Sequence, residues 1–271
     1  MTIIRPPAVA GAFYPADAES LHTMIVHYLK ASHVSAPPPK AIIVPHAGYI
    51  YSGLIAASAY ALLAQVRETI ANVVLLGPSH WVTFAGLAVS SAEAFATPLG
   101  VISVDGDGLA RVLALPQVCI LDEAHRREHS VEVQLPFLQT VLASFTILPF
   151  VVGEASPEDV GEVLETLWNG QETLIVISSD LSHYYDYATA KTLDHVTSEA
   201  IQALRLEDIT YEQACGFFSV RGLLYAARQH KLRAKTIDLR NSGDTAGPRD
   251  EVVGYGAYAF TPEPRPASFR E

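Results

Sequence analysis

Four short apolar runs, rich in Ile and Val, constrain the fold of this chain more than any other feature of its sequence. They show no polar alternation, which is the pattern of strands covered on both faces. Helical patterns lie between them, starting with a segment that Asp17 can cap and that extends to about Ser32. Strand–helix alternation predicts an α/β fold with a mostly parallel or mixed central sheet and helices on both faces. The four runs are 40–45, 72–76, 145–152 and 173–178.

The remaining pattern predicts a single domain over residues 1–261 and a flexible tail over 262–271. Residues 86–105 indicate a β-hairpin or sheet extension, and 233–241 and 251–261 indicate two closing strands. Further helices are expected at 52–66, capped by Ser52, and at 131–143, 157–168, 187–206 and 211–229.

Charge and cysteine content exclude several classes of protein. The 18 Lys and Arg against 29 Asp and Glu give a net charge of −11, which argues against nucleic acid or an anionic membrane as a partner. Two distant cysteines exclude a disulfide scaffold and suit a reducing compartment. No signal peptide and no run of 18 apolar residues is evident. We therefore expect a soluble cytoplasmic protein.

Three histidines occupy the same position relative to three predicted strands. His46, His80 and His183 each follow an apolar run, just beyond the carboxyl end of the strand. Ligands of open α/β sheets bind in the crevice at those ends. Imidazole is both the commonest metal ligand and the usual general acid or base. A single loop histidine usually has no such role, but three in matching positions favour a shared site.

Polar groups beside these histidines are candidates for the same site. Tyr49 is placed to contact a substrate through its phenol, and Ser79 is placed to hydrogen-bond a ligand. Asp180 lies three residues before His183. It is expected to orient that imidazole or to support a metal from outside its ligand set, and a helix cap is the alternative.

The run EHSVEVQLP at 128–136 is expected to begin a helix, with Glu132 in a first turn where the helix dipole favours a carboxylate. That interpretation leaves His129 unexplained, so we expect it to line the pocket. Glu128 can complete a 2-His-1-carboxylate site for non-haem iron. Cys215 is a candidate soft ligand or thiolate. The sequence pattern leaves the choice between Glu128 and Cys215 open.

Six motifs together resemble the Memo family, whose bacterial and archaeal members are called AmmeMemoRadiSam system proteins, here of the B type. The resemblance covers about residues 5–260, and the combination is highly specific. The family is similar in fold to class III extradiol dioxygenases of the protocatechuate 4,5-dioxygenase type, which use non-haem Fe(II). The motifs are VAGAFYP at 9–15, PHAGYIYSG at 45–53, GPSH at 77–80, EHSVEVQLPFL at 128–138, SSDLSHY at 178–184 and CG at 215–216.

The resemblance implies roles for individual residues. His46 and His80 match the imidazoles that hold the metal, and Cys215 matches the position where the dioxygenases have a carboxylate. His183 matches their acid/base histidine, and His129 lines the same pocket. A thiolate favours softer metals than a carboxylate does. We therefore expect one divalent transition metal, Fe(II) first, with copper and zinc as alternatives.

The function expected from these features is metal-dependent redox or oxygenase-type chemistry on a small substrate, with His183 and Asp180 as the catalytic residues. Two alternatives stay open. One is a non-enzymatic module that binds a peptide or small molecule in the same pocket. The other is a hydrolase with Cys215 as nucleophile and His183 as base. The family name also implies a functional association with a radical-SAM protein.

Overall fold

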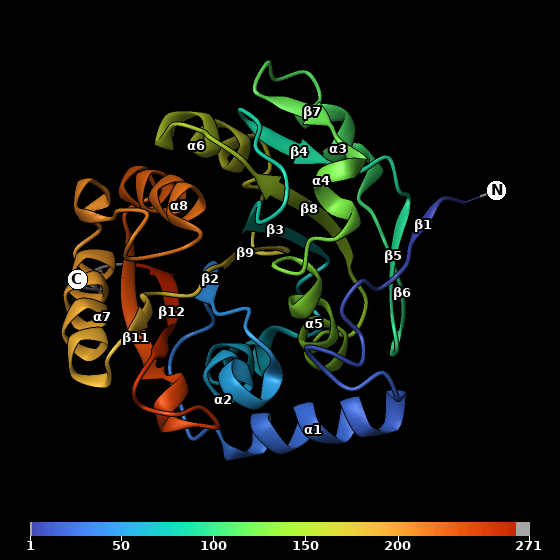
Figure 1. Cartoon of the computed structure of the whole chain (residues 1–271). Helices are drawn as coiled ribbons and strands as arrows, with labels where there is room; N and C mark the ends of the chain where they lie inside the picture. Colours follow the sequence, from blue (N-terminus) through green and yellow to red (C-terminus); the bar gives the residue numbers. More distant parts are fainter. Residues whose placement is uncertain (1, 264–271) are drawn as a thin grey trace, which may run out of the picture.

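A mixed β-sheet forms the centre of the computed structural model, which describes residues 2–263 (Figure 1). Within those residues the sheet has nine strands, in the order β10-β12-β2-β9-β3-β8-β4-β7, with β11 also paired to β12. The strands are β2 Ala41–Val44, β3 Asn72–Pro78, β4 Leu87–Val89, β7 Val118–Ile120, β8 Thr146–Val152, β9 Thr173–Ser178, β10 His183–Tyr185, β11 Leu232–Asn241 and β12 Val252–Pro262.

The four middle strands of this sheet are parallel. β9 pairs in parallel with both β2 and β3, and β3 pairs in parallel with β8. On either side of them the neighbouring strand is antiparallel: β12 pairs with β2, and β4 pairs with β8. The four predicted apolar runs are therefore confirmed as neighbours in one parallel block, and their carboxyl ends meet at a single edge.

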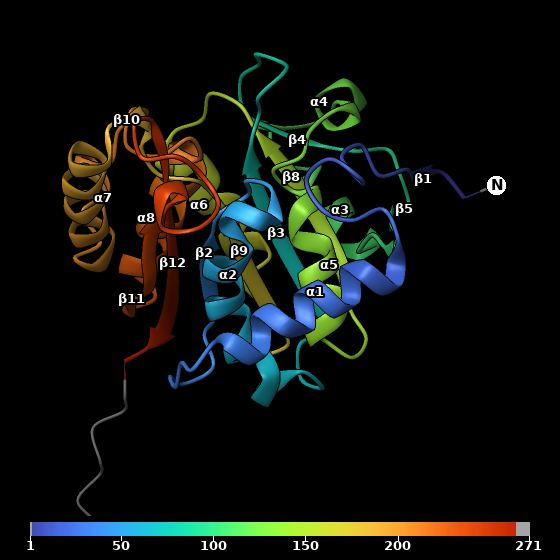
Figure 2. The same ribbon diagram turned by 60° about the horizontal axis from the view of Figure 1, so that its bottom comes forward.

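The alternation of side chains along each middle strand builds two separate cores. On β2, Ile42 and Val44 join one core while Ala41 and Ile43 join the other. The helices α1, α2 and α5 supply the first core, and α6, α7 and α8 supply the second (Figures 1 and 2). The predicted α/β fold with helices on both faces is confirmed.

The helices begin and end largely where capping chemistry allows. Asp17 caps α1 by accepting the N–H of Ser20, as expected, and Ser156 caps α6 with a capping box. The helices are α1 Ala18–Ala31, α2 Tyr49–Tyr60, α3 Gly106–Val112, α4 Asp122–Arg126, α5 Leu135–Val141, α6 Pro157–Thr166, α7 Tyr187–Gln202 and α8 Phe217–Gln229, with short 3₁₀ turns η1 Ala61–Val66, η2 Glu132–Gln134, η3 Leu206–Asp208 and η4 Ser242–Asp244.

Two helix starts differ from the sequence-based expectation. The helix expected to begin after Ser52 starts at Tyr49, and the Ser52 hydroxyl donates to the carbonyl of Ala47. The helix expected from residue 211 starts at Phe217, because the preceding residues form a turn closed on the carbonyl of Thr210. In the first case Ser52 was assigned to the cap, although it lies inside the first turn of the helix.

A second, three-stranded sheet lies beside the main one, with β5 Ala94–Thr97 between β1 Ile4–Arg5 and β6 Gly100–Ser103. β5 and β6 form the expected hairpin, and β1 adds to β5 in parallel. The N-terminal strand thus enters the fold next to a segment about ninety residues away, as β1 and β5 show in Figure 1.

One helical stretch, Tyr49–Val66, is apolar and long enough to cross a membrane, with a mean hydropathy of 1.3, and 61% of it is buried inside the fold. That burial is what a core helix shows. The expected tail at 262–271 lies outside the described residues, except for Pro262, which ends β12, and Glu263.

Candidate metal centre

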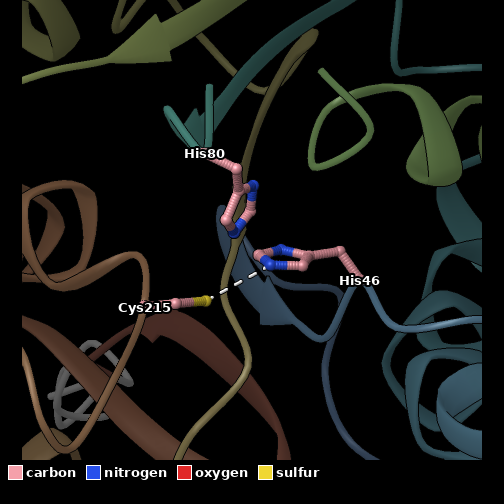
Figure 3. Close-up of side chains that lie close together, drawn as sticks. All are labelled: His46, His80 and Cys215. Atoms are coloured by element: carbon pink, nitrogen blue, oxygen red, sulfur yellow. Dashed lines mark hydrogen bonds between the residues drawn. The ribbon is translucent and has the colours of Figure 1, made fainter. Parts of the chain in front are cut away.

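Three side chains from three separate segments converge at the carboxyl edge of the parallel strands. His46 follows β2, His80 follows β3, and Cys215 precedes α8. One ligand atom from each lies within 4.8 Å of the other two. Figure 3 shows the two imidazoles and the thiol directed toward one another. Strand position alone predicted that the two histidines meet. Cys215 was one of two candidates for the third ligand, and the resemblance placed it at the ligand position.

His46 is almost fully buried and held by hydrogen bonds. Its Nδ1 lies 2.9 Å from the hydroxyl oxygen of Ser178, and its backbone N–H donates to a carboxylate oxygen of Asp180 at 2.7 Å. Its Nε2 lies 3.2 Å from the Sγ of Cys215. Burial, followed by the charge of His80, lowers the pKa of His46 well below its usual value. The ring is therefore neutral near pH 7, as a metal ligand must be.

His80 is held by Glu128, which is fully buried. One carboxylate oxygen lies 2.8 Å from Nδ1 of His80, and the other accepts the backbone N–H of His80 at 2.7 Å. Burial alone would raise the pKa of Glu128, but hydrogen bonds and the charge of His80 outweigh it and lower the pKa to about 2. Glu128 is thus an ionised acceptor that fixes His80 and leaves its Nε2 free.

These contacts bear on the choice between Cys215 and Glu128 as the third ligand. A second group of His80, Glu128 and His129 also has its ligand atoms close together. However, Glu128 already accepts the N–H groups of His129 and Ser130, in addition to both contacts with His80. A carboxylate behind a metal-binding imidazole is the usual supporting arrangement. The geometry therefore favours Cys215 as ligand and Glu128 as support.

Cys215 fits a metal ligand better than a nucleophile. Its Sγ accepts the backbone N–H of Asp180 at 3.2 Å. Burial, followed by the charge of Asp180, raises the pKa of Cys215, so the thiolate needed for nucleophilic attack is disfavoured without a metal. The imidazole beside the sulfur belongs to His46 and not to His183. The Cys215–His183 pair expected for a hydrolase is therefore not formed.

The other predicted histidines lie around the same cluster. The ring of His129 stacks on His80 with centroids 4.5 Å apart and meets His46 edge-on at 5.5 Å. Burial, followed by the charge of His46, lowers the pKa of His129 to about 4. His183 begins β10, close enough for its charge to influence both His46 and Asp180. The rings of His46, His80 and His129 therefore pack against one another, and His183 lies near them.

Three groups make contacts other than those first expected from the sequence. Asp180 does not orient His183, because Nδ1 of His183 is bonded at 2.8 Å to the carbonyl of Leu181. Asp180 instead accepts the backbone N–H of His46, which agrees with the second, supporting role expected for it. Tyr49 is buried against Phe137. Its hydroxyl donates to the carbonyl of Val133 at 2.6 Å instead of facing a substrate. The hydroxyl of Ser79 donates within its own turn at 2.6 Å. For Tyr49 and Ser79, a backbone carbonyl accepts the hydroxyl that we had assigned to a ligand.

The sequence analysis missed three residues that support the site: Ser178, Gln134 and Glu132. Ser178 and Gln134 are buried, Ser178 is hydrogen-bonded to His46, and Gln134 donates to Ser178. Glu132 binds the N-terminal segment instead of acting through a helix dipole. A signal was present, because two polar residues within the apolar run VEVQLPFL must find buried partners.

Sequence comparisons with known proteins match nearly the whole chain. The family model described as Memo-like protein covers residues 5–259. A MEMO1 family protein of Aquifex aeolicus is 38% identical over 268 residues, covering 95% of this chain and 99% of its own. One of Archaeoglobus fulgidus is 36% identical over 271 residues, with the same coverages. The crystal structure of an uncharacterized protein from Escherichia coli K12 has a TM-score of 0.47 and 13% identity, covering 79% of this chain and 98% of its own.

Proposed function

The chain belongs to the Memo-like protein family, and we propose that it holds one divalent transition metal on His46, His80 and Cys215 for redox or oxygenase-type chemistry on a small substrate. The observation that carries this proposal is the convergence of two imidazole nitrogens and one sulfur within 4.8 Å. Donors of these types match the transition metals, whereas oxygen-only sets suit Mg²⁺ or Ca²⁺.

The donor set fits a metal that accepts both nitrogen and sulfur. Fe(II) is proposed first because the Memo family resembles iron-dependent extradiol dioxygenases, and the soft thiolate makes copper and zinc the alternatives. When bound, the ion supplies Lewis-acid or redox chemistry toward O₂ or an oxygenated substrate. The chain itself supplies the neutral imidazole of His46, the carboxylate-supported imidazole of His80 and the sulfur of the half-buried Cys215.

His183 is proposed as the group that moves a proton in this site. A carbonyl oxygen can only accept, so the contact with Leu181 places the proton of neutral His183 on Nδ1. Its Nε2 is then a free acceptor, the form that a general base requires. Leu181 sets the orientation of this ring, and Asp180 acts on the neighbouring loop of His46.

Metal content after anaerobic purification tests the proposal directly. We expect about one iron, copper or zinc per chain by mass spectrometry. His46→Ala and Cys215→Ala should both lose it. His195→Ala is the matched control, because His195 is exposed on α7 and pairs only with Glu199. A protein that stays metal-free after reconstitution, or a Cys215→Ala variant that keeps its metal, would contradict the proposed site.

Replacing His183 by Ala should separate metal binding from proton transfer. Metal content should remain at the wild-type level, because Nδ1 of His183 is used by Leu181 and the ring lies outside the converging donor set. Turnover should fall roughly 10²–10⁴-fold, the usual contribution of a positioned acid or base. Oxygen consumption with catechols and thiols as trial substrates measures it. Unchanged turnover in a metal-loaded variant would remove His183 from the mechanism.

A further inference from the structure

We propose that Gln134 and Ser178 are positioning residues that hold His46 in the tautomer protonated on Nδ1, so that Nε2 is free to bind a metal. The effect on metal affinity rests on the proposed function. The tautomer itself does not, because it follows from hydrogen bonds within the chain alone.

Two hydrogen bonds determine the orientation of the Gln134 amide. Its nitrogen lies 2.9 Å from the carbonyl oxygen of Pro45, and only a donor can satisfy that oxygen. Its oxygen accepts the hydroxyl of Tyr60 at 2.9 Å. A flipped amide would place two acceptors together at Pro45. Because both side chains are buried, no water is available to compensate, and the amide keeps this orientation.

The hydroxyl of Ser178 then has a single possible arrangement. It donates its only proton to the carbonyl of Ser130 at 2.6 Å. One of its two lone pairs accepts the second N–H of Gln134 at 2.8 Å. One lone pair remains, and Nδ1 of His46 lies 2.9 Å away. A hydroxyl carries one donor and two acceptor sites, so His46 must be the donor in this contact.

The consequence for His46 concerns the neutral form of its ring. A neutral imidazole with a proton on Nδ1 has a lone pair on Nε2. That atom faces the Sγ of Cys215 at 3.2 Å (Figure 3). The nearest carboxylate, Asp180, lies 4.0 Å from Nε2 and accepts the backbone N–H of the same histidine. The ligand atom is therefore directed and unprotonated before any metal arrives.

The two histidines are held at Nδ1 by groups of different kinds. Glu128 fixes His80 through a carboxylate, where the side chain is still 30% exposed. Gln134 and Ser178 fix His46 through neutral groups, where the side chain is 2% exposed and a further buried charge would be costly. Glu128 and Gln134 both come from the segment 128–134. Residues 128–134 therefore help to orient both imidazole ligands.

The tautomer is tested on the metal-free protein by ¹⁵N NMR of the histidine side chains, with the His46 signal assigned by its absence in His46→Gln. Wild type should show His46 protonated on Nδ1 alone. Ser178→Ala removes the acceptor and should shift a measurable fraction of His46 to the Nε2-protonated form. Ser58→Ala is the control for loss of a buried serine hydroxyl, because Ser58 bonds only to Ile55 in its own helix.

The effect on metal binding is measured with Zn²⁺ in competition with a chelator. Ser178→Ala should weaken the affinity about 10–100-fold, the usual result of losing a group that orients a ligand. Ser178→Thr and Ser178→Val introduce side chains of nearly the same shape, and only the Thr side chain keeps the hydroxyl. Binding should therefore recover in the Thr variant and stay weak in the Val variant. This comparison separates orientation of His46 from simple packing.

Two results would overturn the inference: an unchanged His46 tautomer in Ser178→Ala, or equal Zn²⁺ affinities for the Thr and Val variants. Failure of the proposed function looks different. In that case the wild-type protein binds no metal, while Ser178→Ala still changes the tautomer of His46.

Discussion

Replacing Glu132 by Gln should lower the free energy of unfolding by about 3–5 kcal/mol, the usual cost of leaving one buried charge without its partner. The side chain of Glu132 is fully buried and pairs with the guanidinium of Arg5, which is 7% exposed. It also accepts the backbone N–H groups of Ala8 and Val9 at 2.7 and 2.9 Å. The hydroxyl of Tyr14 donates to it at 2.7 Å.

A glutamine at this position has one acceptor where the carboxylate has two. Its amide hydrogens would face at least one of the donors that the carboxylate now satisfies, and Arg5 would keep only the carbonyls of His125 and Glu128. Glu68→Gln is the matched control, because Glu68 pairs with Arg67 at the surface, where such pairs contribute little. Chemical denaturation of both variants measures the difference. A loss below about 1 kcal/mol for Glu132→Gln would show that this buried cluster is not what anchors the N-terminus.

The same cluster connects the N-terminal segment to the candidate metal centre. Glu132 holds residues 8–14, and the ring of Phe13 within them packs on His129 with centroids 4.6 Å apart. The carbonyl of Phe13 also accepts the backbone N–H of Tyr49, which begins the helix after His46. Loss of Glu132 should therefore loosen one wall of the site as well as the fold.

Local patterns in the sequence were sufficient for the parts of the fold that depend on local physics. The cap at Asp17 and the parallel middle strands follow from side-chain chemistry and apolar runs. Because parallel strands share one carboxyl edge, the meeting of His46 and His80 followed as well. These features needed no knowledge of which distant segments pair.

The remaining features depend on contacts between distant segments, which periodicity does not encode. Cys215 reaches the site because its N–H donates to the carbonyl of Asp180, 35 residues away. Glu132 was assigned to a helix start because an acidic residue there has the same local pattern whether it is solvated or buried against Arg5. The resemblance identified Cys215, but only the structure shows Glu128 as a supporting group.

Replacing Glu128 by Gln is the second change for which we expect a large effect. The carboxylate of Glu128 accepts N–H groups from His80, His129 and Ser130. The NH₂ group of a glutamine would face N–H groups that need an acceptor. The hydrogen bond that holds the ring of His80 would then be lost. Zn²⁺ affinity should fall about 10–100-fold, as for other groups that orient a ligand. Glu123→Gln is the control, since Glu123 lies in the same region but pairs with Arg126 at the surface.

The stability lost in Glu128→Gln should depend on pH in a defined direction. The pKa of Glu128 falls from 4.5 to about 2 on folding, where the hydrogen bonds and charge of His80 outweigh burial. The folded state therefore favours the ionised form, and the carboxylate contributes up to about 3 kcal/mol at pH 7. That contribution is complete above about pH 4.5 and is lost as the pH falls toward 2. Denaturation at pH 7 and pH 3 should show the gap between wild type and variant shrinking by about half. A gap that is constant or grows on acidification would mean that Glu128 is not held ionised by His80.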